Sequence, residues 1–165
     1  MMKIDNYMKI CIGLLTGLGL LTGCAIENDI PYPIVDGSVT AIEMEGQCDA
    51  EGNNSTQATI NKEDRTVQLY VDDTVDLTKA RIKRLSVSNG ATIQIDSAFC
   101  YNAAKFPTTG WENLDQLAIS ADTRINCSRD VRFTLSTYQD YDWTLRVQRI
   151  VKRNIVMENQ IGNAV

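Results

Sequence analysis

Three aromatic residues lie close together in a polar part of the chain, where they are candidates for ligand binding. Tyr101, Phe106 and Trp111 belong to a stretch from residue 96 to 130 that lacks apolar periodicity and is rich in asparagine. An exposed aromatic ring offers a flat apolar face that stacks against a sugar ring. The stretch therefore allows two interpretations: the three rings cover the core of the domain, which we favour, or they form a glycan-binding site.

The composition excludes catalysis that depends on histidine and leaves paired carboxylates as the alternative. The 165 residues contain no histidine, which excludes Ser-His-Asp and Cys-His catalysis and metal binding by imidazole. Asp72, Asp73 and Asp76 lack the spacing of an EF-hand loop, so we interpret them as a solvated turn. The sequence singles out no pair of catalytic carboxylates. We therefore expect no enzyme activity, no metal and no cofactor.

The charge of the chain argues against nucleic acid as a partner. The formal net charge is −5 at pH 7, whereas binding to nucleic acid requires a basic surface. The three neighbouring cations Arg81, Lys83 and Arg84 are interpreted as a solvated strand face.

The N-terminal residues have the pattern of a targeting segment. Lys3 and Lys9 are followed by an apolar run from residue 10 to 21. At 1.5 Å per residue this run covers roughly 18 Å, less than the roughly 30 Å of a membrane's hydrocarbon core, so a permanent transmembrane helix is disfavoured. The run ends in Leu21-Thr22-Gly23-Cys24, which resembles the lipobox of bacterial lipoproteins.

This resemblance implies a signal peptide over residues 1–23 and lipidation of Cys24. In such lipoproteins the thiol receives a diacylglyceryl group, and the signal peptidase cleaves before the cysteine. Two or three acyl chains anchor a protein stably, since each buried methylene contributes about 0.8 kcal/mol. The acidic residues Glu27 and Asp29 resemble the surface-export signal of Bacteroidetes lipoproteins. We expect a lipid anchor in the outer membrane and exposure at the cell surface; a plain secretory signal with an incidental cysteine is the alternative.

Three cysteines remain once Cys11 leaves with the signal peptide and Cys24 is lipidated. They are Cys48, Cys100 and Cys127, so the mature chain has at most one internal disulfide. A Cys100–Cys127 bond would close the long loop and contribute about 3 kcal/mol to stability. The alternative is three reduced, mostly buried thiols.

Apolar periodicity predicts an extended tether over residues 24–36 and an all-β sandwich over residues 37–153. Its clearest strand has Val67, Leu69 and Val71 on one face and polar residues on the other. Several short antiparallel strands without an amphipathic helix favour a sandwich of immunoglobulin-like type.

Three further features belong to this pattern. In residues 80–88 the apolar positions change parity, which predicts a β-bulge near Lys83 and Arg84. Trp143 alternates with apolar residues and is predicted to lie in the core. Residues 155–160 match residues 42–47 at four of six positions, so we interpret 154–165 as a linker and the first strand of a truncated second repeat.

Four short segments carry a family resemblance. They are Asn28-Asp29-Ile30-Pro31-Tyr32-Pro33, Asp64-Arg65-Thr66-Val67, Val75-Asp76-Leu77-Thr78 and Ser88-Asn89-Gly90-Ala91-Thr92. These segments resemble the N-terminal portion of Bacteroidetes lipoproteins that have a carbohydrate metabolism domain further along, and similar immunoglobulin-like modules begin surface glycan-binding proteins. The resemblance implies an immunoglobulin-like antiparallel β-sandwich in a carbohydrate-handling envelope system. It supplies no catalytic residues, because the large domain that gives those proteins their name is outside this chain.

Two tripeptides, Asp73-Thr74-Val75 and Asp96-Ser97-Ala98, resemble the O-glycosylation sequon of Bacteroidetes envelope proteins. They make Thr74 and Ser97 candidates for modification.

The first functional hypothesis is a lipid-anchored, non-catalytic spacer or scaffold module in a carbohydrate-handling system. The second is a glycan-binding protein that uses the aromatic loop of residues 99–117. The third is a fimbria-like structural subunit. The partners expected are a membrane through the lipid anchor, and a glycan or other envelope proteins.

Overall fold

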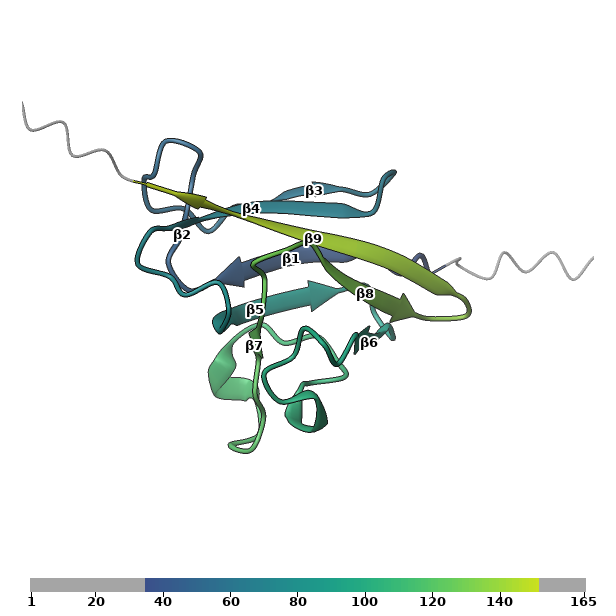
Figure 1. The fold of residues 1–165 in the computed structure, drawn as a ribbon. Coiled ribbons are helices and arrows are strands. Elements are labelled where there is room, and N and C mark those ends of the chain that lie inside the picture. Colours follow the sequence, from purple (N-terminus) through teal and green to yellow (C-terminus); the bar gives the residue numbers. More distant parts are fainter. Residues whose placement is uncertain (1–34, 152–165) are drawn as a thin grey trace, which may run out of the picture. The chain divides into compact units, whose positions relative to one another are not determined.

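The computed structural model describes residues 35–151, which form an all-β module (Figure 1). The predicted signal peptide (1–23), the tether before residue 35 and the predicted repeat strand (154–165) lie outside the described residues. No helix in the described part is long and apolar enough to cross a membrane.

Two short 3-10 helices, η1 (Ala103–Lys105) and η2 (Leu114–Gln116), lie between the sixth and seventh strands. The strands are β1 (Val39–Met44), β2 (Gln47–Cys48), β3 (Thr59–Asn61), β4 (Thr66–Asp72), β5 (Ala80–Val87), β6 (Thr92–Ile95), β7 (Arg124–Ile125), β8 (Val131–Ser136) and β9 (Asp140–Ile150).

The strands form two sheets around one apolar core. One sheet has the order β2-β4-β9-β8-β6 with β3 beside β4, and the other has the order β1-β5-β7. Figure 1 shows β4 and β9 running above β1 and β5. Val67, Leu69 and Leu145 of the first sheet belong to the same buried cluster as Ile42 and Ile82 of the second. The predicted all-β sandwich is confirmed.

One strand pair differs from the all-antiparallel expectation. β4 and β9 are parallel, with Thr66 opposite Thr144 and Asp72 opposite Ile150. Apolar alternation has the same form in either strand direction, so the sequence pattern of β4 did not indicate its orientation. A parallel pair requires a long crossover between its strands. Residues 73–139 provide that crossover, which contains β5 and β7 of the second sheet as well as β6 and β8 of the first.

The predicted bulge in β5 is confirmed. Glu43 of β1 lies opposite Arg84, but the next residue, Met44, lies opposite Ile82. Lys83 is therefore the extra residue. Because of this extra residue, Ile82 and Leu85 both reach the core, with exposed fractions of 2% and 3%.

Trp143 lies in the core as predicted and ties the start of the module to β9. Its side chain is 1% exposed, and its indole Nε1 donates a hydrogen bond to the carbonyl oxygen of Gly37 at 2.8 Å. A Cβ atom at position 37 would overlap the ring of Tyr141. A residue without a side chain is therefore needed where the first segment passes over β9.

Candidate ligand groove

The long loop between β6 and β8 is joined to the sandwich by backbone hydrogen bonds. Trp111 and Leu85 exchange two of them, at 2.8 and 2.9 Å, so the loop adds a short bridge to β5. Ile93 N–H donates to the Thr108 carbonyl at 2.7 Å. These contacts satisfy polar backbone groups that the loop would otherwise bury without partners. The loop is therefore a fixed layer over one end of the core.

Two of the three predicted glycan-binding aromatics are core residues. Trp111 is 4% exposed and Phe106 is 9% exposed, and their rings meet edge to face with centroids 6.0 Å apart. The indole Nε1 of Trp111 donates to the Lys83 carbonyl at 3.1 Å. A buried ring has no free face for a sugar, so the glycan-binding hypothesis is wrong for Trp111 and Phe106. The favoured interpretation, that they cover the core, is the observed arrangement.

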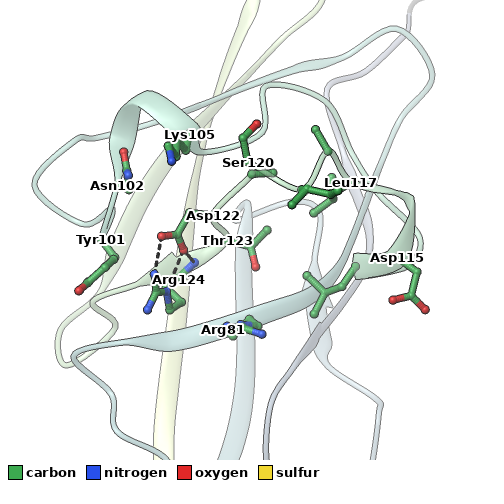
Figure 2. Close-up of a pocket in the computed structure, with 14 residues that line it drawn as sticks. Arg81, Tyr101, Asn102, Lys105, Asp115, Leu117, Ser120, Asp122, Thr123 and Arg124 are labelled. Atoms are coloured by element: carbon green, nitrogen blue, oxygen red, sulfur yellow. Dashed lines mark hydrogen bonds and ion pairs between the residues drawn. The ribbon is translucent and has the colours of Figure 1, made fainter.

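Tyr101 is the exception, because 53% of its surface is exposed. It lines a groove of about 680 Å³ on the outer side of the loop (Figure 2). This volume is in the range of small-molecule sites. We call this hollow the loop groove, and its lining residues are Arg81, Tyr101, Asn102, Lys105, Leu114, Asp115, Leu117, Ala118, Ile119, Ser120, Ala121, Asp122, Thr123 and Arg124.

Two arginines stand side by side in the lining of the loop groove. Arg81 of β5 and Arg124 of β7 are direct partners in an antiparallel strand pair. Residues at such positions project from the same face of the sheet with Cβ atoms about 4.5–5.5 Å apart, and like charges there repel. The short β7 strand therefore places two guanidinium groups together at the solvent surface.

Arg124 is held in place by Asp122 and Tyr101. Its Nη2 and Nε donate to the two carboxylate oxygens of Asp122 at 2.7 and 2.9 Å, a bidentate pair. These hydrogen bonds from Arg124 hold the pKa of Asp122 below its usual range. The guanidinium carbon of Arg124 lies 4.0 Å from the centroid of the Tyr101 ring, which is a cation–π contact. Figure 2 shows this arrangement with the two hydrogen bonds as dashed lines.

The other two cations that line the groove lack side-chain partners. Within residues 35–151, the guanidinium of Arg81 and the ammonium of Lys105 form no hydrogen bond or ion pair, although Arg81 acts on Asp122 through space. Three cationic side chains thus face two carboxylates, those of Asp115 and Asp122. The lining residues therefore include one more cation than carboxylates, although Glu45, outside the lining, also attracts Arg124.

Of the two alternatives for Cys100 and Cys127, the structure has the reduced state, because both residues are free thiols. Cys100 faces Ile125 across an antiparallel bridge, which puts Cys127 in the diagonal position. Diagonal neighbours are about 7–8 Å apart, whereas disulfides need Cα atoms within about 6.8 Å. The Cys127 thiol instead donates to the Leu77 carbonyl at 3.4 Å. Burial raises the pKa of Cys100 and of Cys127 to about 11.

The candidate glycosylation residues lie in exposed turns. Thr74 and Ser97 are both exposed, and the Thr74 hydroxyl donates a short hydrogen bond to Asp72. Asp76 accepts from the backbone and hydroxyl of Thr78 at 2.9 and 2.7 Å, so these aspartates form turns as interpreted from the sequence. Among the described residues, no group of three or more histidine, cysteine or acidic side chains is placed to hold a metal. Modification of Thr74 and Ser97 stays a prediction.

Sequence reasoning did not identify the charged residues of the loop groove. Arg81 was assigned to a solvated strand face, and Lys83 and Arg84 do lie there, in ion pairs with Glu43 and Glu112. The spacing of Asp122 and Arg124, two residues apart, was the signal that could have identified this ion pair. In an extended strand such residues project from one face and can pair.

Two solved structures are distantly similar to this chain. No family model and no curated protein matches the sequence. A candidate glycoside hydrolase from Bacteroides thetaiotaomicron is similar in structure over 72% of this chain, with a TM-score of 0.45 and 12% identity. This chain covers 26% of that protein. A candidate secreted protein from Bacteroides fragilis is similar over 70% of this chain and 96% of its own length, with a TM-score of 0.43 and 10% identity. At these TM-scores neither likeness supports an argument about function.

Proposed function

We propose that this chain is a lipid-anchored envelope lipoprotein whose β-sandwich is a non-catalytic spacer or scaffold in a carbohydrate-handling system. The anchor is supported by the motif Leu21-Thr22-Gly23-Cys24 behind a short apolar run. The carbohydrate setting is supported by the resemblance of residues 28–33, 64–67, 75–78 and 88–92 to Bacteroidetes lipoproteins.

The spacer role is supported by where the chain enters and leaves the sandwich, and this observation carries the proposal. Val35 is held at the hairpin between β8 and β9, where the Thr137 hydroxyl donates to its carbonyl at 3.0 Å. The chain leaves after Ile150, at the far end of β9 (Figure 1). β9 has 11 residues, so its ends are separated by roughly 33 Å. The two ends of the described module are therefore separated by about the length of β9.

The first experiment tests the anchor. The full-length protein is expressed in a bacterial host with radiolabelled palmitate. We expect the label in the wild type and in Cys11→Ser, and its loss in Cys24→Ser together with accumulation of the uncleaved precursor. Cys11→Ser is the matched control, because it removes a cysteine from the same segment. An unacylated N-terminus on the wild-type protein would contradict the anchor.

A second experiment tests the spacer role itself. Single cysteines are introduced as Val35→Cys or Val151→Cys in a Cys100→Ser background and labelled with a fluorophore on the membrane-bound protein. Quenchers in the lipid headgroups then report the height of each position. We expect the fluorophore at position 151 to be much less quenched than that at position 35. Equal quenching would mean that the sandwich does not extend away from the membrane.

The other hypotheses differ in their support. The hypothesis of a fimbria-like subunit depends on residues 155–165, which lie outside the described part. The glycan-binding reading loses Trp111 and Phe106 but retains Tyr101 and the loop groove.

A further inference from the structure

We propose that the loop groove binds an acidic saccharide, with Arg81, Lys105 and Arg124 as the groups that bind its carboxylates. The inference deepens the proposed function, since it names a ligand class for a module of a carbohydrate-handling system.

The paired arginines carry the charge argument. Arg81 and Arg124 are cross-strand partners on one face, where like charges repel, and Asp122 offsets part of this repulsion. Asp122 is paired with Arg124 through both carboxylate oxygens. Glu45 lies nearby, but its Oε1 accepts the backbone N–H of Arg81 at 3.1 Å and it does not line the groove. The guanidinium of Arg81 is therefore available to a ligand.

The position of Arg124 suits anion binding. Its pair with Asp122 and its contact with the Tyr101 ring hold the guanidinium in one orientation. An arginine fixed in this way loses little side-chain entropy when it binds a further carboxylate. Lys105 of η1 adds a second unpaired cation to the same lining, so the groove matches a ligand with more than one acidic group.

The backbone around the groove favours a saccharide over an acidic peptide. β7 pairs with β5 on one side. On its other side, Tyr101 N–H donates to Arg124 and Asn126 N–H donates to Phe99, at 3.0 and 2.7 Å. Both edges of β7 are thus occupied, and a peptide cannot add a strand there.

The remaining recognition groups are side chains. The amide of Asn102 and the hydroxyl of Ser120 line the groove, and neither side chain forms a hydrogen bond with another residue between 35 and 151. Such groups are suited to the hydroxyls of a sugar.

The test is calorimetric titration of the full-length lipoprotein in detergent with oligogalacturonate. We expect binding that weakens as salt is added, because the contacts are between charges near the surface. The methyl ester of the same oligosaccharide keeps every ring and hydroxyl but loses the negative charges. We expect its affinity to be lower by about tenfold or more.

Variants assign the binding to the groove. Arg81→Gln and Lys105→Gln should each weaken oligogalacturonate binding about tenfold, whereas Lys62→Gln, which removes an exposed cation outside the groove, should not. Arg81→Gln should change the melting temperature little, because it removes both the repulsion from Arg124 and the attraction to Asp122. A clear fall in the melting temperature would indicate a structural role for Arg81.

Four results would overturn the inference. They are equal affinity for the acid and the ester, no binding of the acid, equal weakening by Lys62→Gln, and binding of oligoglutamate as tight as that of oligogalacturonate. The last would assign the groove to acidic peptides. None of these results bears on acylation of Cys24 or on the height of position 151, so failure of the inference is separable from failure of the proposed function.

Discussion

The two tryptophans of the chain lie in different kinds of structure but make the same kind of contact. Trp143 belongs to the long strand β9, and Trp111 belongs to the irregular loop between β6 and β8. Both are buried, at 1% and 4% exposure. Each donates its indole N–H to a backbone carbonyl far away in the sequence, Trp143 to Gly37 and Trp111 to Lys83.

The difference lies in how each tryptophan is placed in the core. Trp143 is placed by the period of its own strand, since Tyr141 and Leu145 beside it are also buried. Trp111 is placed by its two backbone hydrogen bonds to Leu85, a residue that is remote in sequence. A local pattern therefore identifies the first tryptophan as core, whereas the second is identified only once the loop and β5 are seen together.

The largest expected effect is that of Trp143→Ala. The change removes a fully buried indole and leaves the Gly37 carbonyl without its donor, so we expect a loss of about 5 kcal/mol in the free energy of unfolding. Chemical denaturation followed by circular dichroism measures it. Trp143→Phe should cost clearly less, because it keeps an aromatic ring in the space. If the alanine variant unfolds at the same denaturant concentration as the wild type, Trp143 does not support the core.

Trp111→Ala is expected to cost less, about 3 kcal/mol. The lost indole packs on Phe106 at the margin of the core, where the loop can partly close the space. Tyr101→Ala is the matched control from the same loop, and because its exposed ring makes mainly a cation–π contact with Arg124 we expect a loss of about 1 kcal/mol or less. If Trp111→Ala instead leaves the melting temperature unchanged and abolishes glycan binding, the tryptophan is a binding residue and the comparison fails.

The strands were predictable because each has a face that must be buried. The alternation in β4 and the change of parity in β5 follow from side chains that point to opposite faces at each step. The bulge at Lys83 was predictable for the same reason, since it is the only way to bury both Ile82 and Leu85. The direction of β4 relative to β9 was not predictable, because apolar alternation is the same for parallel and antiparallel strands.

The loop groove was not predictable from these patterns. β7 is only two residues long, which is too short for any period to be visible. The meeting of Arg81 and Arg124 depends on its pairing with β5, a long-range contact. The sequence did identify Tyr101 as an aromatic residue in a polar loop.

The smallest expected effect concerns the cysteines of the loop region and tests whether this region is held together without a cross-link. Cys100 and Cys127 are free thiols at diagonal positions, so dithiothreitol should leave the melting temperature of the wild type unchanged. Burial raises the pKa of each to about 11, from an ordinary value of 9.0. Since the folded-state pKa is above the unfolded value, the stability linked to the neutral thiols is fully present below pH 9 and is lost as the pH rises towards 11.

The same shift predicts the reactivity of these thiols. Because the thiolate is the nucleophile, alkylation of the native protein by iodoacetamide should be slow at pH 7 and should accelerate as the pH approaches 11. Cys100→Ser should remove most of the native reactivity, since Cys127 is 1% exposed. A loss of about 3 kcal/mol on reduction would show that the protein isolated from an oxidising compartment contains the disulfide after all. The loop region would then depend on a covalent bond, whereas β9 and its neighbours depend on packing alone.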